Sequence, residues 1–92
     1  MRIEIRREAD DDLNRIVAWI GRDSPHAAVE VVRRIRRHIR RLATPALSGI
    51  GRPGRDPGTR ELVEPPYIIV YEVHEDEEEL VVLAIFHSAR DR

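Results

Sequence analysis

The stretch YIIVYEVHEDEEELVVLAIFH, residues 67–87, decides the fold of this 92-residue chain. Two apolar runs, 67–74 and 80–87, flank the segment 75–78, which is too acidic to be buried. Successive strand residues point to opposite faces, and the second run is apolar on both faces, which is typical of a central strand. We therefore predict an antiparallel hairpin at the centre of a sheet.

The segment before this hairpin predicts a loop and one further strand. Residues 44–58 contain three Pro and four Gly, which is a loop composition, and 59–63 form a short strand that ends at Pro65-Pro66. The loop contains GIGRPG, residues 49–54, a formal match to the dinucleotide-binding pattern GxGxxG. We reject that match because the pattern needs a strand before it and a helix after it, whereas here a helix precedes and an extended segment follows.

The N-terminal half predicts an edge strand and two helices. Residues 1–6 alternate apolar and charged side chains, and such charges suit a sheet edge. A helix follows from about residue 8 to Gly21, with Asp10, Asp11 and Asp12 placed at the positive end of its dipole. Ser24-Pro25 starts a second helix of about nineteen residues that ends before Pro45. With so short a connection, the helices must form an antiparallel hairpin.

The predicted order is β-α-α-β-β-β, an α+β fold in one domain that spans 1–92. The helical hairpin packs on one face of a mainly antiparallel sheet. We expect the other face to be only partly covered and to have a partner there. Trp19 lies beside the apolar stripe of the first helix, and we expect it to cover the margin of the core.

Composition excludes several classes of protein. The chain has no Cys and hence no disulfide, thiolate metal site or Cys nucleophile. Its four His lack metal-ligand spacing, so no metal is expected. It shows neither a secretion signal nor an apolar run of about 20 residues, which makes a cytoplasmic protein without membrane contact the expectation. Residues 1–46 hold eleven Arg against seven acids, whereas 47–92 hold five against ten, so the charge is polarised.

The second helix carries an arginine-rich side opposite its apolar stripe. A solvated helix face and a docking surface for phosphate backbone or an acidic protein both fit this pattern. The residues are Arg33, Arg34, Arg36, Arg37, Arg40 and Arg41.

A second group of polar residues could support chemistry on a phosphodiester. Arginines stabilise charge that develops on phosphate, and His moves protons near neutral pH, which together suffice for RNA cleavage. The group is Arg60, His87 and Arg90, with Arg52 and Arg55 in the preceding loop. The alternative is structural: Arg60 pairs with a neighbouring carboxylate (Glu61, Glu72 or Asp91) and His87 ends a strand.

The amino-acid sequence of the whole chain resembles the RelE/ParE family of toxins from bacterial type II toxin-antitoxin modules. The segments that carry the resemblance are EADDDLNRIVAWI and SPHAAVEVVRRI in the helices, then GRPGRDPGTREL, PYIIVYEV and LVVLAIFHSARDR. The family has two branches: RelE-like members are ribosome-dependent endoribonucleases that cut mRNA, and ParE-like members inhibit DNA gyrase. This chain is more similar to ParE, because it has Ser88 where ribonucleases often have a Tyr and it contains no Lys.

The resemblance implies a cytoplasmic toxin that inhibits DNA gyrase, arrests growth, needs no cofactor and forms a hetero-oligomer with a cognate antitoxin. Arg60, His87, Arg90, Arg52 and Arg55 are the predicted target-binding residues, and Arg33, Arg37, Arg40, Arg41 and Trp19 are the predicted antitoxin-binding residues. Two alternatives stay open. One is a RelE-like ribonuclease acting on mRNA at the ribosome, with Arg60 and His87 catalytic, and the other is a non-toxic binding module that shares the fold.

Overall fold

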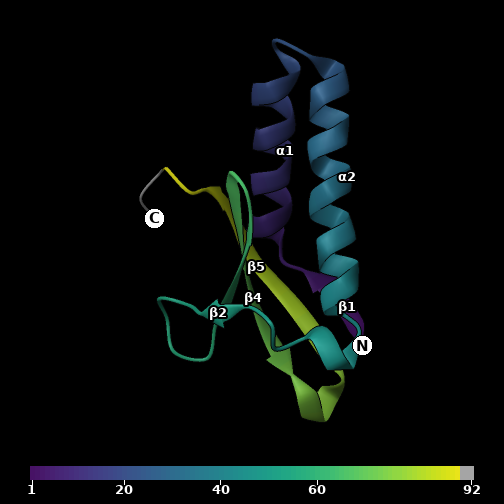
Figure 1. Cartoon of the computed structure of the whole chain (residues 1–92), viewed down its shortest axis with the longest axis vertical. Helices are drawn as coiled ribbons and strands as arrows, with labels where there is room; N and C mark the ends of the chain where they lie inside the picture. Colours follow the sequence, from purple (N-terminus) through teal and green to yellow (C-terminus); the bar gives the residue numbers. More distant parts are fainter. Residues whose placement is uncertain (90–92) are drawn as a thin grey trace.

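The strands β4 (Tyr67–His74) and β5 (Glu79–His87) form the centre of a five-stranded sheet, as the sequence predicts (Figure 1). The computed structural model describes residues 1–89. Within them the remaining elements are β1 (Arg2–Ile5), α1 (Arg7–Gly21), α2 (Pro25–Leu42), η1 (Pro45–Leu47), β2 (Arg52–Pro53), β3 (Arg60–Glu64) and η2 (Glu75–Glu77). None of the helices in this part of the chain is long and apolar enough to cross a membrane.

The sheet has the order β1-β5-β4-β3-β2. Strand β1 lies at one edge, as predicted, and runs parallel to β5, whereas all other neighbours are antiparallel. The prediction missed β2, which pairs with β3 at the other edge through Arg52 and Pro53. Two residues are too few to show a period, and Pro53, which lacks an N–H, is tolerated only at an edge.

The helices form the predicted antiparallel hairpin and pack against the sheet, chiefly through α1 on β5 (Figure 1). Helix α2 begins where the sequence indicates: the Ser24 hydroxyl accepts a hydrogen bond from the Ala27 N–H at 3.1 Å, and Pro25 occupies the first turn. Helix α1 begins at Arg7, so Asp10 lies in its first turn, whereas Asp11 and Asp12 lie beyond it, and the predicted dipole role is wrong for these two residues.

The core lies between the hairpin and the sheet. A β-bulge between Val70 and Tyr71 of β4 leaves Leu83 of β5 as the extra residue, because Val70 pairs with Ala84 and Tyr71 with Val82. The bulge changes which residues of β5 face the helices, so that Val82 and Ile85, three positions apart, both reach the core. The buried cluster is Ala9, Leu13, Ile35, Ile39, Leu42, Tyr67, Ile69, Tyr71, Leu80, Val82 and Ile85.

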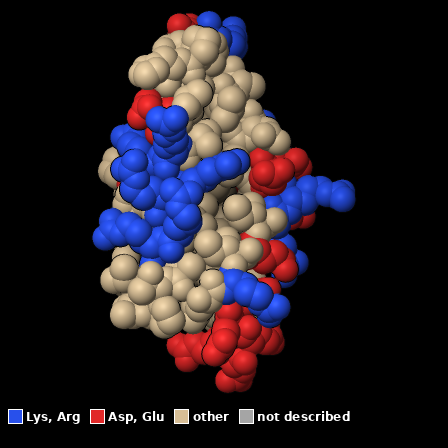
Figure 2. Space-filling model, turned by 90° about the vertical axis from the view of Figure 1, so that its right-hand side faces the viewer, with Lys and Arg blue, Asp and Glu red and all other residues tan. Residues whose placement is uncertain are grey.

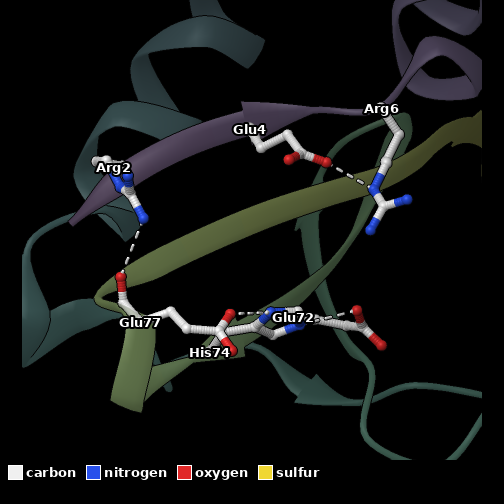
Figure 3. Close-up of polar contacts among 6 residues, drawn as sticks. All are labelled: Arg2, Glu4, Arg6, Glu72, His74 and Glu77. Atoms are coloured by element: carbon white, nitrogen blue, oxygen red, sulfur yellow. Dashed lines mark hydrogen bonds and ion pairs between the residues drawn. The ribbon is translucent and has the colours of Figure 1, made fainter.

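The sheet face away from the helices differs from the expectation. Ile68, Val70 and Val81 alternate with core residues and so lie on this face, yet they are 7%, 2% and 0% exposed. Val81 is flanked by Glu4 on β1 and Glu72 on β4, and charged side chains spread over this face (Figure 3). The central strands therefore present no open apolar surface there.

Candidate functional site

A cleft of about 760 Å³ opens between α1 and the C-terminal half of β5. One wall is α1, and the other is built by β4, β5 and the loop before β3. The lining residues are Asp12, Arg15, Ile16, Trp19, Ile20, Arg55, Asp56, Tyr67, Ala84, Ile85, Phe86 and His87. Polar and apolar groups line the cleft in similar measure, and a concave surface of this kind is a candidate binding site.

Trp19 is the most exposed large apolar residue of the cleft. Its side chain is 61% exposed, so the expectation that it covers the core margin is wrong. The Arg22 guanidinium lies 5.3 Å from the ring centroid, in cation–π geometry one turn away. Trp19 lies near the C-terminal end of α1, and this helix extends past the end of the sheet (Figure 1).

Asp12 holds the two walls of the cleft together. Its Oδ2 accepts a hydrogen bond from the Ile85 N–H of β5 at 2.9 Å, and its Oδ1 pairs with Arg15. Strand β1 stops pairing with β5 at Val82, so the Ile85 N–H points past the end of that strand. The carboxylate on α1 supplies the acceptor that the missing strand would have provided. Sequence analysis placed Asp12 in the helix but missed this contact, which needs the tertiary structure.

His87 lies inside the cleft at the end of β5. Its ring stands edge-on to Tyr67 at 5.6 Å between centroids, and its Nδ1 accepts a hydrogen bond from the Ala89 N–H at 3.1 Å. The remaining ring nitrogen, Nε2, is then the one that carries the proton when the ring is neutral.

Arg60 lies at another part of the sheet and stabilises a loop. Its Nη1 donates to the carbonyl oxygens of Gly51 at 2.9 Å and Gly49 at 3.2 Å, and neither Glu61 nor Glu72 forms an ion pair with it; the third proposed partner, Asp91, lies outside the described residues. Tyr71 holds the same loop, since its hydroxyl accepts from the Gly51 N–H at 3.0 Å and donates to the Ser48 carbonyl at 2.9 Å. The glycine stretch 49–54 thus lies between η1 and β3 and does not have the strand-to-helix context of a dinucleotide site.

The structure does not bring Arg60 and His87 together. Arg60 pairs with Tyr71 across β3 and β4, whereas His87 pairs with Tyr67 across β4 and β5. Four residues along β4 and two strand spacings across it separate their Cα atoms by on the order of 15 Å. Of the other predicted target-binding residues, Arg55 lines the cleft, Arg52 pairs with Glu61 at 3.1 Å, and Arg90 lies outside the described residues.

The predicted antitoxin-binding residues lie on two surfaces. Trp19 lines the cleft, but none of the four arginines does. Arg33, Arg37, Arg40 and Arg41 project from α2 on the side away from the core (Figure 2). Figure 2 shows them as one basic area, separated from the acidic end of the molecule at the β4–β5 connection.

A network of ionisable side chains covers the sheet face away from the helices (Figure 3). The His74 ring hydrogen-bonds to Glu72 at 3.1 Å and to Glu77 at 3.3 Å, and Arg2 donates to the Glu77 carbonyl at 3.4 Å. The hydrogen bond to Glu72 is the main cause that raises the pKa of His74, with a smaller opposing effect of burial and further support from Glu77. His74, Glu77 and Glu79 also place ligand atoms within 4.8 Å of one another, but these carboxylate contacts already engage both ring nitrogens.

The chain is a small α+β domain with one large cleft described within residues 1–89, and the predicted catalytic residues Arg60 and His87 do not lie together in it. The chain belongs to the ParE toxin family of type II toxin-antitoxin systems: residues 3–92 match the family described as "ParE toxin of type II toxin-antitoxin system, parDE". It is therefore a toxin of a type II system, which confirms the family and the branch indicated by the sequence.

Individual relatives agree with this assignment. The chain is 47% identical over 73 residues to "Putative toxin Y4kP" of Sinorhizobium fredii (strain NBRC 101917 / NGR234), covering 77% of this chain and 74% of the relative. It superposes on a chain of the chromosomal ParDE toxin-antitoxin system from P. aeruginosa with a TM-score of 0.80 at 29% identity over 95% of both chains.

A more distant structure shares the fold. A chain of the toxin-antitoxin complex RelBE2 from Mycobacterium tuberculosis superposes with a TM-score of 0.62 at 19% identity, covering 94% of this chain and 95% of that one.

Proposed function

We propose that this toxin arrests growth in the cytoplasm by inhibiting DNA gyrase and that a cognate antitoxin neutralises it by occupying the cleft. The match to the ParE family over residues 3–92 carries the proposal. The position of Arg60 supports it, because this side chain holds the 49–51 loop on the far part of the sheet from His87. A ribonuclease that used both residues on one phosphate would need them a few ångströms apart.

The cleft is the proposed binding site for the antitoxin. Its walls combine exposed Trp19 with Ile16, Ile20 and Phe86, and large aromatic side chains contribute most to the affinity of protein interfaces. Charged groups on its rim, among them Arg15 and Asp56, would fix the orientation of the bound segment. The similar structure from P. aeruginosa is of a ParDE toxin-antitoxin system.

The target is tested by induced expression with parallel measurements of DNA supercoiling and mRNA cleavage, followed by a supercoiling assay with purified gyrase. We expect growth arrest, loss of supercoiling activity and intact mRNA. His87→Ala should keep most of the arrest, since inhibition by binding needs no proton transfer. Arrest with cleaved mRNA that His87→Ala abolishes would establish the ribonuclease alternative, and the absence of arrest would favour the non-toxic binding module.

The antitoxin site is tested with the product of the neighbouring gene in a binding assay. Trp19→Ala should weaken its binding at least tenfold, which corresponds to about 1.4 kcal/mol. Val29→Ala is the matched control, because Val29 is 51% exposed on α2 and does not line the cleft. Equal affinity of the Trp19 and Val29 variants would place the antitoxin elsewhere.

A further inference from the structure

The exposed side of α2 carries several arginines that pair with no carboxylate in residues 1–89. We define the arginine face as Arg36, Arg37, Arg40 and Arg41 (Figure 2). Nearby Arg33 pairs with Glu30 at 3.4 Å, and Arg34 lies 3.9 Å from Glu64. Among residues 1–89, by contrast, no carboxylate pairs with any of the four members of the arginine face.

Packing does not explain these arginines. The buried residues Ile35, Ile39 and Leu42 lie on the opposite side of α2 and hold the helix on the fold without them. Glu30 is the sole acid of the helix, so the arginines, which lie three and four positions apart, repel one another. The helix dipole compensates only Arg40 and Arg41 in the last turn. The arginine face therefore carries a charge excess that no carboxylate of residues 1–89 offsets and that a polyanionic partner would balance.

The geometry points to the phosphate backbone of nucleic acid. Arg36 to Arg41 span about 8 Å along the helix axis, and duplex DNA carries one negative charge per about 1.7 Å, so several phosphates lie within reach at once. The planar guanidinium donates two parallel hydrogen bonds to a phosphate, which Lys does not. Because every charge lies on one helix, the backbone loses little conformational freedom on contact, and the entropy cost falls on the side chains.

We propose that the arginine face binds duplex DNA through its phosphates, without sequence specificity. The preference for duplex DNA over RNA rests on the proposed function, since gyrase acts on duplex DNA. A protein partner fits the face less well, because the four outward positions are all Arg and offer no apolar anchor of the kind that protein interfaces bury. A single strand fits less well too, since no aromatic ring lies among the arginines to stack on a base.

The acidic end of the molecule would orient the contact. Glu75, Asp76 and Glu77 form η2, and Glu78 and Glu79 follow directly. Figure 2 shows an acidic area at one end of the molecule and a larger basic area away from it, with mostly uncharged residues between the two areas. DNA would repel the acidic end, so the duplex lies along α2 while the cleft on α1 and β5 stays open to another partner. The formal net charge of -1 does not oppose local binding of this kind.

The test is fluorescence anisotropy of the free chain with a 20-base-pair duplex of arbitrary sequence in 50 to 200 mM KCl. We expect dissociation constants of about 10⁻⁴ to 10⁻⁶ M and a slope of log K against log salt near -3.6 for four phosphates, at about -0.9 each. The variant R36Q/R37Q/R40Q/R41Q should bind at least tenfold more weakly with a slope near zero. Gln is a good helix former, so helix propensity is kept.

The matched control R2Q/R6Q/R7Q/R22Q removes the same charge from other elements and should keep the affinity within about threefold. Circular dichroism establishes that both variants are folded. If the quadruple variant does not fold, R36Q/R37Q and R40Q/R41Q are measured separately, and each should reduce the slope by about half. Equal losses in the test and control variants would overturn the inference, because they would report net charge and not a site.

Three further outcomes would overturn it: no binding by the unmodified chain at 50 mM KCl, tighter binding of duplex RNA than of DNA, or antitoxin binding that needs the four arginines when DNA binding does not. The supercoiling assay separates this inference from the proposed function. DNA binding without gyrase inhibition would overturn the proposed function alone. Gyrase inhibition by a chain that does not bind DNA would overturn the inference alone.

Discussion

Arg60 donates a hydrogen bond to the Gly51 carbonyl oxygen at 2.9 Å, and the same guanidinium nitrogen reaches the Gly49 carbonyl at 3.2 Å. This contact explains why a residue with the chemical character of a phosphate ligand lies away from the cleft. Together with Tyr71, Arg60 fixes the loop that leads into the edge strand β2. Substitutions in this loop are therefore expected to change the stability of the protein without changing its toxicity directly.

Gly51→Ala should destabilise the protein by about 1–3 kcal/mol, because the new methyl group has no room. A Cβ at Gly51 would lie 2.6 Å from the Tyr71 hydroxyl and 2.9 Å from the Glu61 carbonyl oxygen. Gly49→Ala is the control, since nothing lies within 4 Å of a Cβ there. Urea unfolding of both variants measures the difference, and equal midpoints would show that the loop has another conformation in solution.

Arg60→Ala should lower the free energy of unfolding by about 1–3 kcal/mol, since two loop carbonyls lose a charged donor. Arg52→Ala removes an exposed pair with Glu61 and should cost about 1 kcal/mol or less. Thermal denaturation of the purified variants measures whether Arg60→Ala lowers stability more than Arg52→Ala does. At a temperature where both are folded, the Arg60 variant should still inhibit gyrase. Full stability with lost toxicity would instead assign Arg60 to the target surface.

Asp12→Ala should destabilise the protein by about 1–3 kcal/mol, because the Ile85 N–H loses its acceptor. The neighbouring Asp11→Ala serves as control, because Asp11 is exposed and its side chain forms no ion pair within residues 1–89. Hydrogen exchange of the Ile85 amide is the direct measurement and should accelerate in the Asp12 variant alone. Unchanged exchange would mean that the bond between α1 and β5 is absent in solution.

His74 should make stability depend on pH. The hydrogen bond to Glu72 raises its pKa in the folded state, so its contribution is fully present below the unfolded value of about 6.5 and is lost as pH rises through the folded value. The melting temperature of the wild type should therefore exceed that of His74→Gln most at low pH, and the difference should shrink toward pH 8.

An NMR titration of the His74 ring provides the direct measurement of this pKa. Glu72→Gln removes the largest cause of the shift and should lower the pKa of His74. The ring of the exposed His26, on the other end of the molecule, is the internal reference in the same spectra. A His74 pKa that does not respond to Glu72→Gln would contradict the contact between the two side chains.

The fold could be predicted from local patterns. The two apolar runs 67–74 and 80–87 placed the central strands, Ser24-Pro25 placed the start of α2, and the alternating apolar and charged residues of 1–6 placed an edge strand. The two-residue strand β2 and the bulge at Leu83 were not predicted. Both result from pairing with another strand, so neither produces a periodic pattern in the local sequence.

The candidate site was predicted less well than the fold. The sequence pointed to Arg60 and His87 as one group, but strand register puts them at different parts of the sheet. It assigned Asp12 to a helix dipole, although the carboxylate bonds to β5. Distances between side chains on different elements depend on register and helix placement, which a single sequence does not encode locally.

The sequence by itself determined the two long helices, the main strands, the fold class and the excess of arginine on α2, because hydrophobic periodicity, turn residues and charge are properties of neighbouring positions. Its resemblance to known toxins indicated the family. Only the tertiary structure decided that Arg60 stabilises the 49–51 loop, that Trp19 opens onto a cleft, and that four arginines lack carboxylate partners within residues 1–89. The physical reason is that these features depend on which distant groups meet across packed elements.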